Sequence, residues 1–355
     1  MEVLCVKRIF LVTILAILMV SVFAGLNGKV AEIDKYGNTY TDLVQASAVE
    51  AGLEVGDMVT LSFGEHRLIV PFVRNYGDVD RGQPLLRVSG GKLLMAANYG
   101  NFSKVYNIAI GMNVAIDLFE KGAYLDELEI RNLVRTDVRA DYVSDVVFSN
   151  FRPVMLGDIA PNTLFRCSHP AIDDPRAPFA NTLVEAVGIK TVLNLSDSDE
   201  ELAASYQYSN FYRSLGESGQ IINLNMGVDM LSEDFSQKLR KGLLFLIENE
   251  PPYLVHCVEG KDRAGIVSAL LGAIMNAEAE EIYEDYILSY TNYYHVKPGT
   301  PAYDAVRKII VDIFVIMNDG KPVDDSNIRF VALKYLRTKV GLSLEEIQKL
   351  KDILH

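Results

Sequence analysis

The chain is poor in the residues that stabilise small exported domains or bind nucleic acids. Its 355 residues contain no tryptophan and three cysteines, which are Cys5, Cys167 and Cys257. A disulfide framework needs more paired cysteines than this, so the fold must depend on its hydrophobic core. Basic residues number 34 against 47 acidic ones, and no basic stripe runs along the chain. We therefore expect no nucleic-acid partner, because Lys and Arg clusters supply that affinity.

The sequence also lacks a cluster of metal-ligating side chains. It has five histidines, and they do not stand at ligand spacing with Cys, Asp or Glu. We expect no metal ion and no other cofactor in the reaction.

Long apolar runs are scarce, and the one at the N-terminus is short. Lys7 and Arg8 precede an uncharged apolar run from Ile9 to Ala24. A basic start, an apolar stretch and a small residue at its end are typical of a signal peptide, predicted here for residues 1–24. A membrane span needs about 20 residues. The prediction is a secreted or extracytoplasmic protein, and the alternative is an uncleaved N-terminal anchor with membrane association.

The length and the hydrophobic content of 49% predict two domains. Residues 28–118 contain short alternating segments separated by turn residues, which favour a small all-β domain. Residues 119–149 are interpreted as a linker or helix. Residues 150–355 alternate strand and helix patterns, which predicts an α/β domain with a central, mostly parallel sheet flanked by helices.

One stretch in the second domain combines several signals for anion binding. Residues 255–265 read VHCVEGKDRAG, and they lie between the apolar run from Tyr253 to Val255 and a second apolar run from Ile266 to Ala277. This order predicts a strand, a loop and the N-terminus of a buried helix. Backbone N–H groups at such a helix N-terminus bind anions.

The residue types in this loop suit nucleophilic chemistry on phosphate. Cys257 reacts only as a thiolate, and the helix N-terminus with Lys261 and Arg263 favours that form. The guanidinium of Arg263 matches two phosphoryl oxygens. Gly260 lets the backbone approach the anion without a Cβ. Asp262 lies in a position to protonate the leaving oxygen as general acid.

The string HCVEGKDRAG resembles the phosphate-binding signature of cysteine-dependent protein tyrosine phosphatases. Its GKDR core is most similar to a bacterial branch that includes phosphoinositide phosphatases. The resemblance implies that Cys257 forms a phosphocysteine, Arg263 binds the phosphoryl oxygens and Asp262 transfers the proton. It also implies that Lys261 binds substrate and His256 holds the loop. The expected substrate-binding set is His256, Val258, Glu259, Gly260, Lys261, Ala264 and Gly265.

The resemblance leaves the substrate and the rate of turnover open. A phosphotyrosyl protein, with dual specificity as a variant, is the first expectation, and a phosphoinositide or inositol phosphate is the alternative. The family usually has Thr or Ser after the arginine, where this chain has Ala264. Slow turnover, or a module that binds phosphate without releasing it, is therefore a second hypothesis.

Three further points have competing interpretations. Asp229 is a rival general acid, because other branches of the family use an aspartate on a separate loop, although it also fits the start of a helix. Tyrosines recur along Glu280 to Tyr294 at helical spacing, which is typical of packing, with substrate contact as the alternative. Cys167 fits a buried thiol, and a redox-switched pair with Cys257 is the alternative.

The β domain carries a weaker resemblance to the C-terminal barrel of SAM hydroxide adenosyltransferases. The matching patterns are Asp34-x-Tyr36-Gly37-Asn38, Gly100-Asn101 and Gly111-Met112-x-Val114. The Asp-rich half that carries that family's chemistry is absent. We expect a partner-binding or substrate-presenting module.

Overall fold

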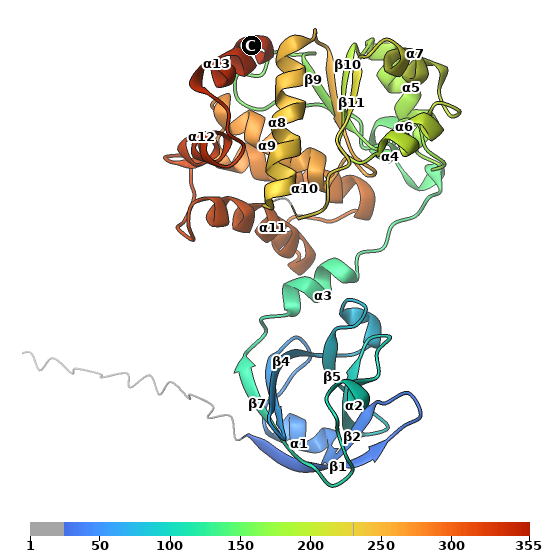
Figure 1. The fold of residues 1–355 in the computed structure, drawn as a ribbon, viewed down its shortest axis with the longest axis vertical. Coiled ribbons are helices and arrows are strands. Elements are labelled where there is room, and N and C mark those ends of the chain that lie inside the picture. The colour runs from blue at the N-terminus through green and yellow to red at the C-terminus, as the bar shows by residue number, and fades with distance from the viewer. Residues whose placement is uncertain (1–24, 230) are drawn as a thin grey trace, which may run out of the picture. The chain divides into compact units, whose positions relative to one another are not determined.

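The structure is a computed structural model that describes residues 25–229 and 231–355. The chain divides into two compact units, one ending at Leu128 and the other running from Glu129 to His355 (Figure 1). The predicted signal peptide or anchor, residues 1–24, lies outside the described residues. None of the helices in the described part of the chain has the length and apolar composition of a membrane span.

The first unit is a closed β-barrel, which confirms the all-β prediction. Its strands are β1 (Leu26–Ile33), β2 (Thr39–Val44), β3 (Met58–Phe63), β4 (His66–Val73), β5 (Pro84–Ser89), β6 (Lys92–Ala97) and β7 (Asn113–Glu120). They pair in the order β1-β2-β6-β5-β4-β3-β7, and only β4 and β5 pair in parallel. Short helices α1 (Gln45–Glu50), η1 (Tyr76–Asp78) and α2 (Phe102–Val105) interrupt the strands. Closure leaves no free sheet edge on the barrel.

Alternation along the strands builds the barrel core. In β3, Val59, Leu61 and Phe63 are buried and join one apolar cluster. Because successive side chains of a strand point to opposite faces, every second residue faces the interior. The sequence pattern and the observed core therefore agree.

The second unit is an α/β domain around a five-stranded sheet. Its strands are β8 (Arg152–Pro153), β9 (Leu164–Cys167), β10 (Thr191–Asn194), β11 (Ile221–Asn223) and β12 (Tyr253–His256). The order is β11-β10-β12-β9-β8, with every pair parallel except β8 with β9. This confirms the predicted fold class.

Helices cover both faces of the sheet (Figure 1). They are α4 (Asp145–Phe148), α5 (Ala177–Val187), α6 (Asp199–Ser205), α7 (Asn210–Glu217), α8 (Glu233–Glu248), α9 (Asp262–Ile274), α10 (Ala279–Tyr294), α11 (Pro301–Met317), α12 (Ile328–Thr338) and α13 (Leu344–Leu354). The last helix begins with a capping box, because Ser343 and Glu346 each accept the other's backbone N–H.

The central strand β12 separates two apolar cores. Tyr253 and Val255 belong to the core that contains residues of α8 and α9, whereas Leu254 belongs to the core under α5 and α7. Helix α9 is buried without interruption from Ala264 to Ile274. A strand and a helix buried in this way fix the position of the loop that joins them.

The segment between the two units has two different parts. Helix α3 (Leu125–Arg131) crosses the division between them. Residues 132–138 and the short helix η2 (Arg139–Asp141) then contact the second unit, where buried Arg176 bonds Asp137 and the carbonyl of Thr136. Of the interval 119–149 predicted as a linker or helix, residues 129–149 therefore belong to the second unit.

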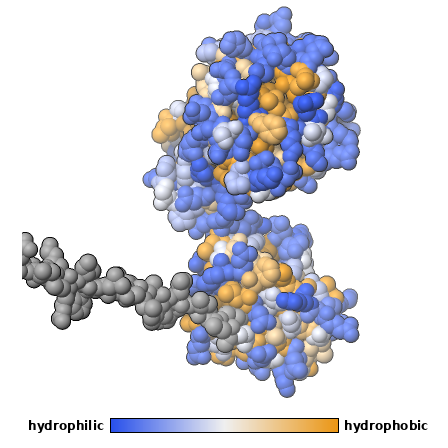
Figure 2. Space-filling model, turned by 90° about the vertical axis from the view of Figure 1, so that its left-hand side faces the viewer, coloured by the Kyte–Doolittle hydropathy of each residue, from blue (hydrophilic) through white to orange (hydrophobic). Residues whose placement is uncertain are grey.

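The surface of each unit is mixed in polarity. On the face drawn in Figure 2, hydrophobic side chains lie among hydrophilic ones in both units. Such mixing is ordinary for a protein surface, so hydropathy alone marks no site.

Candidate active site

The sequence motif forms a loop at the carboxyl end of the central strand. Cys257 follows β12 directly, and α9 begins at Asp262. We call residues 257–263 the motif loop. The thiol of Cys257 is free, and this first residue of the loop is only 3% exposed. Strand, loop and helix N-terminus lie in the predicted order.

Four successive carbonyls of the motif loop point back into the protein. Each accepts a hydrogen bond: Val258 O from the amide of His169 (3.0 Å), Glu259 O from Tyr293 Oη (2.9 Å) and Asn150 Nδ2 (3.1 Å), and Gly260 O and Lys261 O from Arg166 Nη2 (2.8 Å each). The N–H and C=O of a peptide point in opposite directions, so the amides of these peptides point away from the groups that hold the carbonyls. Successive N–H groups on one side of a loop suit an anion.

Glycine is required at one position of this loop. Gly260 has φ +64°, and an added Cβ would lie 1.9 Å from the carbonyl oxygen of Cys167. Only glycine fits this left-handed conformation and this close approach. The sequence predicts that Gly260 lets the loop backbone approach a bound anion. The structure shows that it also lets the backbone approach strand β9.

A buried ion cluster, which we call the floor, holds the loop through the bonds of Arg166 to the carbonyls of Gly260 and Lys261. It consists of Arg152, Arg166 and Asp285. The two oxygens of Asp285 accept from Arg152 Nε (2.9 Å) and Arg166 Nη1 (2.6 Å). Burial would raise the pKa of Asp285, but the two guanidinium groups lower it, and burial lowers the pKa of Arg152 to about 10. The floor therefore exists as charged groups that compensate one another.

Sequence reasoning found only part of the floor. The segment from Leu164 to Pro170 is similar to an edge of the same phosphatase branch, in which an arginine ends a strand near the site, and Arg166 matches that arginine. Arg152 and Asp285 carry no comparable local signature. Asp285 lies within the tyrosine-rich helix next to Glu284, so its charge alone did not distinguish it in the sequence.

His256 supports the loop from behind. It is fully buried, its Nε2 lies 2.9 Å from Tyr212 Oη, and its ring packs edge-on against His169. Burial, reinforced by the neighbouring His169, lowers the pKa of His256 to about 3. Ala264 and Gly265 are also buried, in the first turn of α9. These three predicted substrate-binding residues thus lie behind the loop.

Arg263 is held by the ends of the neighbouring strands. Its Nη1 donates to Met226 O at 2.8 Å and lies 3.5 Å from Leu195 O. Its side chain is partly exposed at the helix N-terminus. The segments after β10 and β11 therefore set the direction of this guanidinium.

The two candidate acids have different surroundings. Asp262 Oδ1 accepts from Tyr290 Oη at 2.8 Å and Tyr286 Oη at 3.3 Å, which positions the carboxylate beside the loop. Asp229 is exposed, and its carboxylate accepts the amide of Leu231 at 3.3 Å in the turn before α8. The structure thus brings Asp262 to the motif loop and uses Asp229 in a local turn.

Two protein-family models match parts of this chain. The model of the tyrosine phosphatase family matches residues 154–314, and that of the SAM hydroxide adenosyltransferase C-terminal domain matches residues 28–115. Residues 154–314 are thus similar to the tyrosine phosphatase family. Both resemblances drawn from the sequence are confirmed. The match to the tyrosine phosphatase family supports phosphoester hydrolysis as the class of activity.

Solved structures show only partial likeness to this chain. An uncharacterized conserved protein from Thermotoga maritima is 28% identical over 26% of this chain and 36% of its own, with a TM-score of 0.26. A conserved hypothetical protein from Thermus thermophilus is 31% identical over 26% and 35%, with a TM-score of 0.22. The core catalytic domain of the PP-IP phosphatase SIW14 from S. cerevisiae is 17% identical over 49% and 96%, with a TM-score of 0.29. The chain spans about a third of the first two structures.

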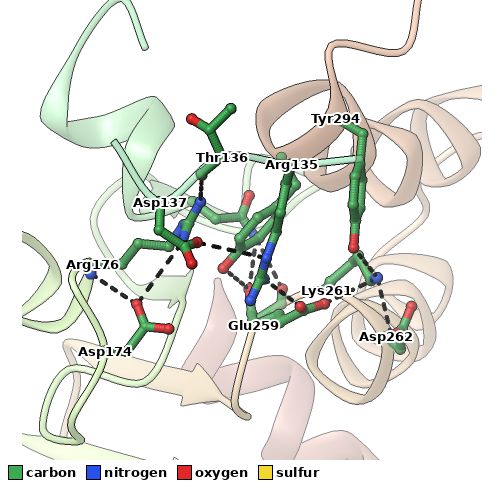
Figure 3. A network of polar contacts seen from close by, with 12 residues as sticks. Arg135, Thr136, Asp137, Asp174, Arg176, Glu259, Lys261, Asp262 and Tyr294 are labelled. Carbon is green, nitrogen blue, oxygen red and sulfur yellow. Dashed lines mark hydrogen bonds and ion pairs between the residues drawn. The ribbon is translucent and has the colours of Figure 1, made fainter. Parts of the chain in front are cut away.

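A second group of charges lies beside the motif loop, and we call it the rim. It consists of Arg135, Glu259 and Lys261 (Figure 3). Glu259 bonds Arg135 Nη1 through Oε1 and lies 3.0 Å from Lys261 Nζ through Oε2. Burial would lower the pKa of Lys261, but the carboxylates of Asp262 and Glu259 raise it. Sequence reasoning missed Arg135, because nothing local links residue 135 to residue 259.

The tyrosines of α10 hold loop residues. Tyr290 and Tyr294 each lie with their rings within 5.0 Å of Lys261 Nζ, and Tyr294 Oη is 3.3 Å from it. Tyr293 supports Glu259 O, as described above. These tyrosines therefore pack against the loop, which agrees with the packing interpretation of their spacing in the sequence.

Cys167 lies beside the loop on the neighbouring strand. It is fully buried, and β9 pairs with β12 so that Cys167 stands opposite His256. Burial raises the pKa of the Cys167 thiol, and both cysteines are free thiols. This agrees with an inert buried thiol.

No metal-binding cluster is present in residues 25–229 and 231–355, since no group of three or more His, Cys, Asp or Glu side chains is arranged to hold an ion there.

Proposed function

We propose that the second unit hydrolyses phosphomonoesters through a phosphocysteine intermediate on Cys257. The observation that carries this proposal is the orientation of the motif loop. Its carbonyls accept hydrogen bonds from the protein behind it, so its amides point to the opposite side, in a loop that begins at the free thiol of Cys257 and ends at a buried helix. Amides, helix N-terminus and Arg263 together favour both a thiolate and a bound phosphate.

The proposed reaction has two steps. The Cys257 thiolate attacks phosphorus, an S–P bond forms, and the P–O bond to the leaving group breaks. Asp262 donates a proton to the leaving oxygen, with Asp229 as the rival donor. Water then attacks phosphorus and gives a proton to the carboxylate that acted as acid, the S–P bond breaks, inorganic phosphate leaves, and the thiolate is restored. Arg263 binds the phosphoryl oxygens throughout.

The first proposed substrate class is a phosphotyrosyl protein, with a phosphoinositide or inositol phosphate as the alternative. The tyrosine phosphatase family match supports the first class. The cations of the rim support the second, because they offer charge beyond one phosphate. Export of the protein, or its attachment to a membrane, remains a prediction from residues 1–24.

The test is hydrolysis of p-nitrophenyl phosphate by the full chain under reducing conditions, followed through the first turnover and at steady state. We expect a burst and turnover in the wild type and a loss of at least about 1,000-fold in Cys257→Ser, since the nucleophile is removed. Cys167→Ser is the matched control and keeps the activity. Absence of a burst in folded wild-type protein would contradict the proposal.

The same experiment decides the second candidate, a phosphate trap. Ala264 is fully buried at the position where the family has a hydroxyl. A burst without turnover, converted to turnover by Ala264→Thr, would favour the trap. Equal turnover in both proteins would reject it.

A further inference from the structure

The rim contains a residue type that is unexpected in a phosphate-binding loop. Glu259 lies two positions after Cys257, and its side chain is 26% exposed. A carboxylate so near the nucleophile opposes both the thiolate and a bound phosphate. The four loop carbonyls are already held by other groups, so the Glu259 side chain is not needed to shape the backbone. Its charge must be compensated by the groups around it.

The compensation comes from two cations on different parts of the chain. Glu259 uses one carboxylate oxygen for Arg135 and the other for Lys261 (Figure 3). Both cations are more than two-thirds buried at their side chains, with 28% and 11% exposed. Further carboxylates stand at longer range, Asp137 at 3.8 Å from Arg135 Nε and Asp262 at 3.7 Å from Lys261 Nζ. One carboxylate thus keeps two cations beside the loop.

Arg135 is fixed in place although it precedes the stretch that matches the family. Its guanidinium lies over the ring of Tyr293, 5.2 Å from the centroid. The backbone next to it is anchored by Arg176, which is 1% exposed and bonds Thr136 O and Asp137. Tyr293 in turn donates to Glu259 O at 2.9 Å. A cation held in this way loses little rotamer freedom when it binds a ligand.

We propose that Arg135 and Lys261 form a second anion subsite beside the motif loop, which selects phosphate esters that carry a second phosphoryl group. In the empty site Glu259 is the counter-ion of this pair. A bound dianion takes its place, and the partly exposed carboxylate turns toward solvent. The inference rests on the proposed function, because the first phosphoryl group occupies the motif loop.

The subsite gives Glu259 a role in specificity. An ester with one phosphate leaves Glu259 paired and gains nothing from the rim. An ester with a second phosphate at the right spacing gains two charge-assisted contacts. Selection then depends on the distance between the two phosphoryl groups.

The test uses alkane bisphosphonates with chains of increasing length as competitive inhibitors of p-nitrophenyl phosphate hydrolysis by the full chain. Each is compared with the alkyl monophosphonate of equal chain length. A charge-assisted contact corresponds to about 10- to 100-fold in affinity. We expect at least one bisphosphonate to bind about tenfold more tightly than its monophosphonate.

Arg135→Ala should reduce this preference to less than about threefold, and Arg135→Lys should restore part of it. Arg240→Ala is the matched control, because Arg240 is also partly buried and pairs with a glutamate, Glu346, on α13. It should keep the wild-type preference. Glu259→Gln should tighten bisphosphonate binding more than monophosphonate binding, since the competing charge is gone.

A wild type without preference at every chain length, or a preference that survives Arg135→Ala, would overturn the inference. Failure of the proposed function is recognised separately. In that case Cys257-dependent hydrolysis is absent, and calorimetric titration of the same inhibitors still measures the preference. A second probe is the same bisphosphonate with an acyl chain, presented in phosphatidylcholine vesicles. Tighter binding of this probe than of the soluble bisphosphonate would indicate a lipid substrate, and equal or weaker binding would indicate a soluble one.

Discussion

The floor and the rim are both clusters of cations around a carboxylate, and they differ in burial. In the floor, Asp285 bonds Arg152 and Arg166, whose side chains are 9% and 0% exposed. In the rim, Glu259 bonds Arg135 and Lys261, whose side chains are 28% and 11% exposed. The pairs are chemically similar, but the carboxylate of the rim is more exposed: the Glu259 side chain is 26% exposed and the Asp285 side chain 13%, so a ligand can replace Glu259 more easily.

Burial therefore separates a structural role from a binding role. A buried ion cluster that loses one member leaves an uncompensated charge in a medium of low dielectric constant. A partly exposed cluster can rehydrate, so its loss affects stability little. The floor should behave as part of the fold, and the rim as part of the binding surface.

The largest expected effect is in the floor. Asp285→Asn leaves two buried guanidinium groups without a counter-charge and should lower the free energy of unfolding by about 3–5 kcal/mol. Urea denaturation at pH 7 measures this. The control Asp312→Asn removes an exposed carboxylate paired with Lys308 and should change the free energy by less than about 1 kcal/mol. Equal effects of the two substitutions would contradict the distinction.

A smaller effect is expected from His256, the buried histidine behind the loop. Its folded pKa of about 3 lies below the ordinary value of 6.5, so the unfolded chain binds more protons between these values. Stability is then complete above pH 6.5 and falls as the pH decreases. The loss between pH 7 and pH 5 should be about 2 kcal/mol.

Urea denaturation of the wild type and of His256→Asn at both pH values checks this expectation. The variant should lose less stability than the wild type over the same interval, because it has no imidazole to protonate. Parallel losses in the two proteins would assign the pH dependence to other groups.

The smallest effect is expected in the rim. Glu259→Gln should change the free energy of unfolding by less than about 1 kcal/mol, because the cluster is partly exposed. Glu346→Gln is a matched control, since Glu346 is exposed to a similar degree and pairs with Arg240. Thermal or urea unfolding measures both. A loss of free energy comparable to that of Asp285→Asn would show that the rim stabilises the fold as the floor does. It would contradict the assignment of the rim to the binding surface.

Much of the site was predictable because its residues are adjacent in the chain. Cys257, Gly260, Lys261, Asp262 and Arg263 lie within seven positions, and the apolar runs on either side predict the strand and helix that orient them. Alternation along short segments likewise predicted the barrel. Local spacing carries this information, since strand and helix periods decide which side chains share a face.

The remaining parts of the site are far apart in the sequence. Asn150, Arg166 and Tyr293 reach the loop carbonyls from elements separated from it by tens of residues. The motif alone led to the prediction that Asp262 and Lys261 support catalysis. Their contacts with tyrosines of α10 are visible only in the packed structure.

The sequence by itself determined the order of strand, loop and helix at Cys257 and the need for glycine at position 260. The tertiary structure decided which charges are buried with a partner and which stay accessible, as in the floor and the rim. The physical reason is that the energy of a charge depends on the groups and the solvent around it, and long-range packing determines both.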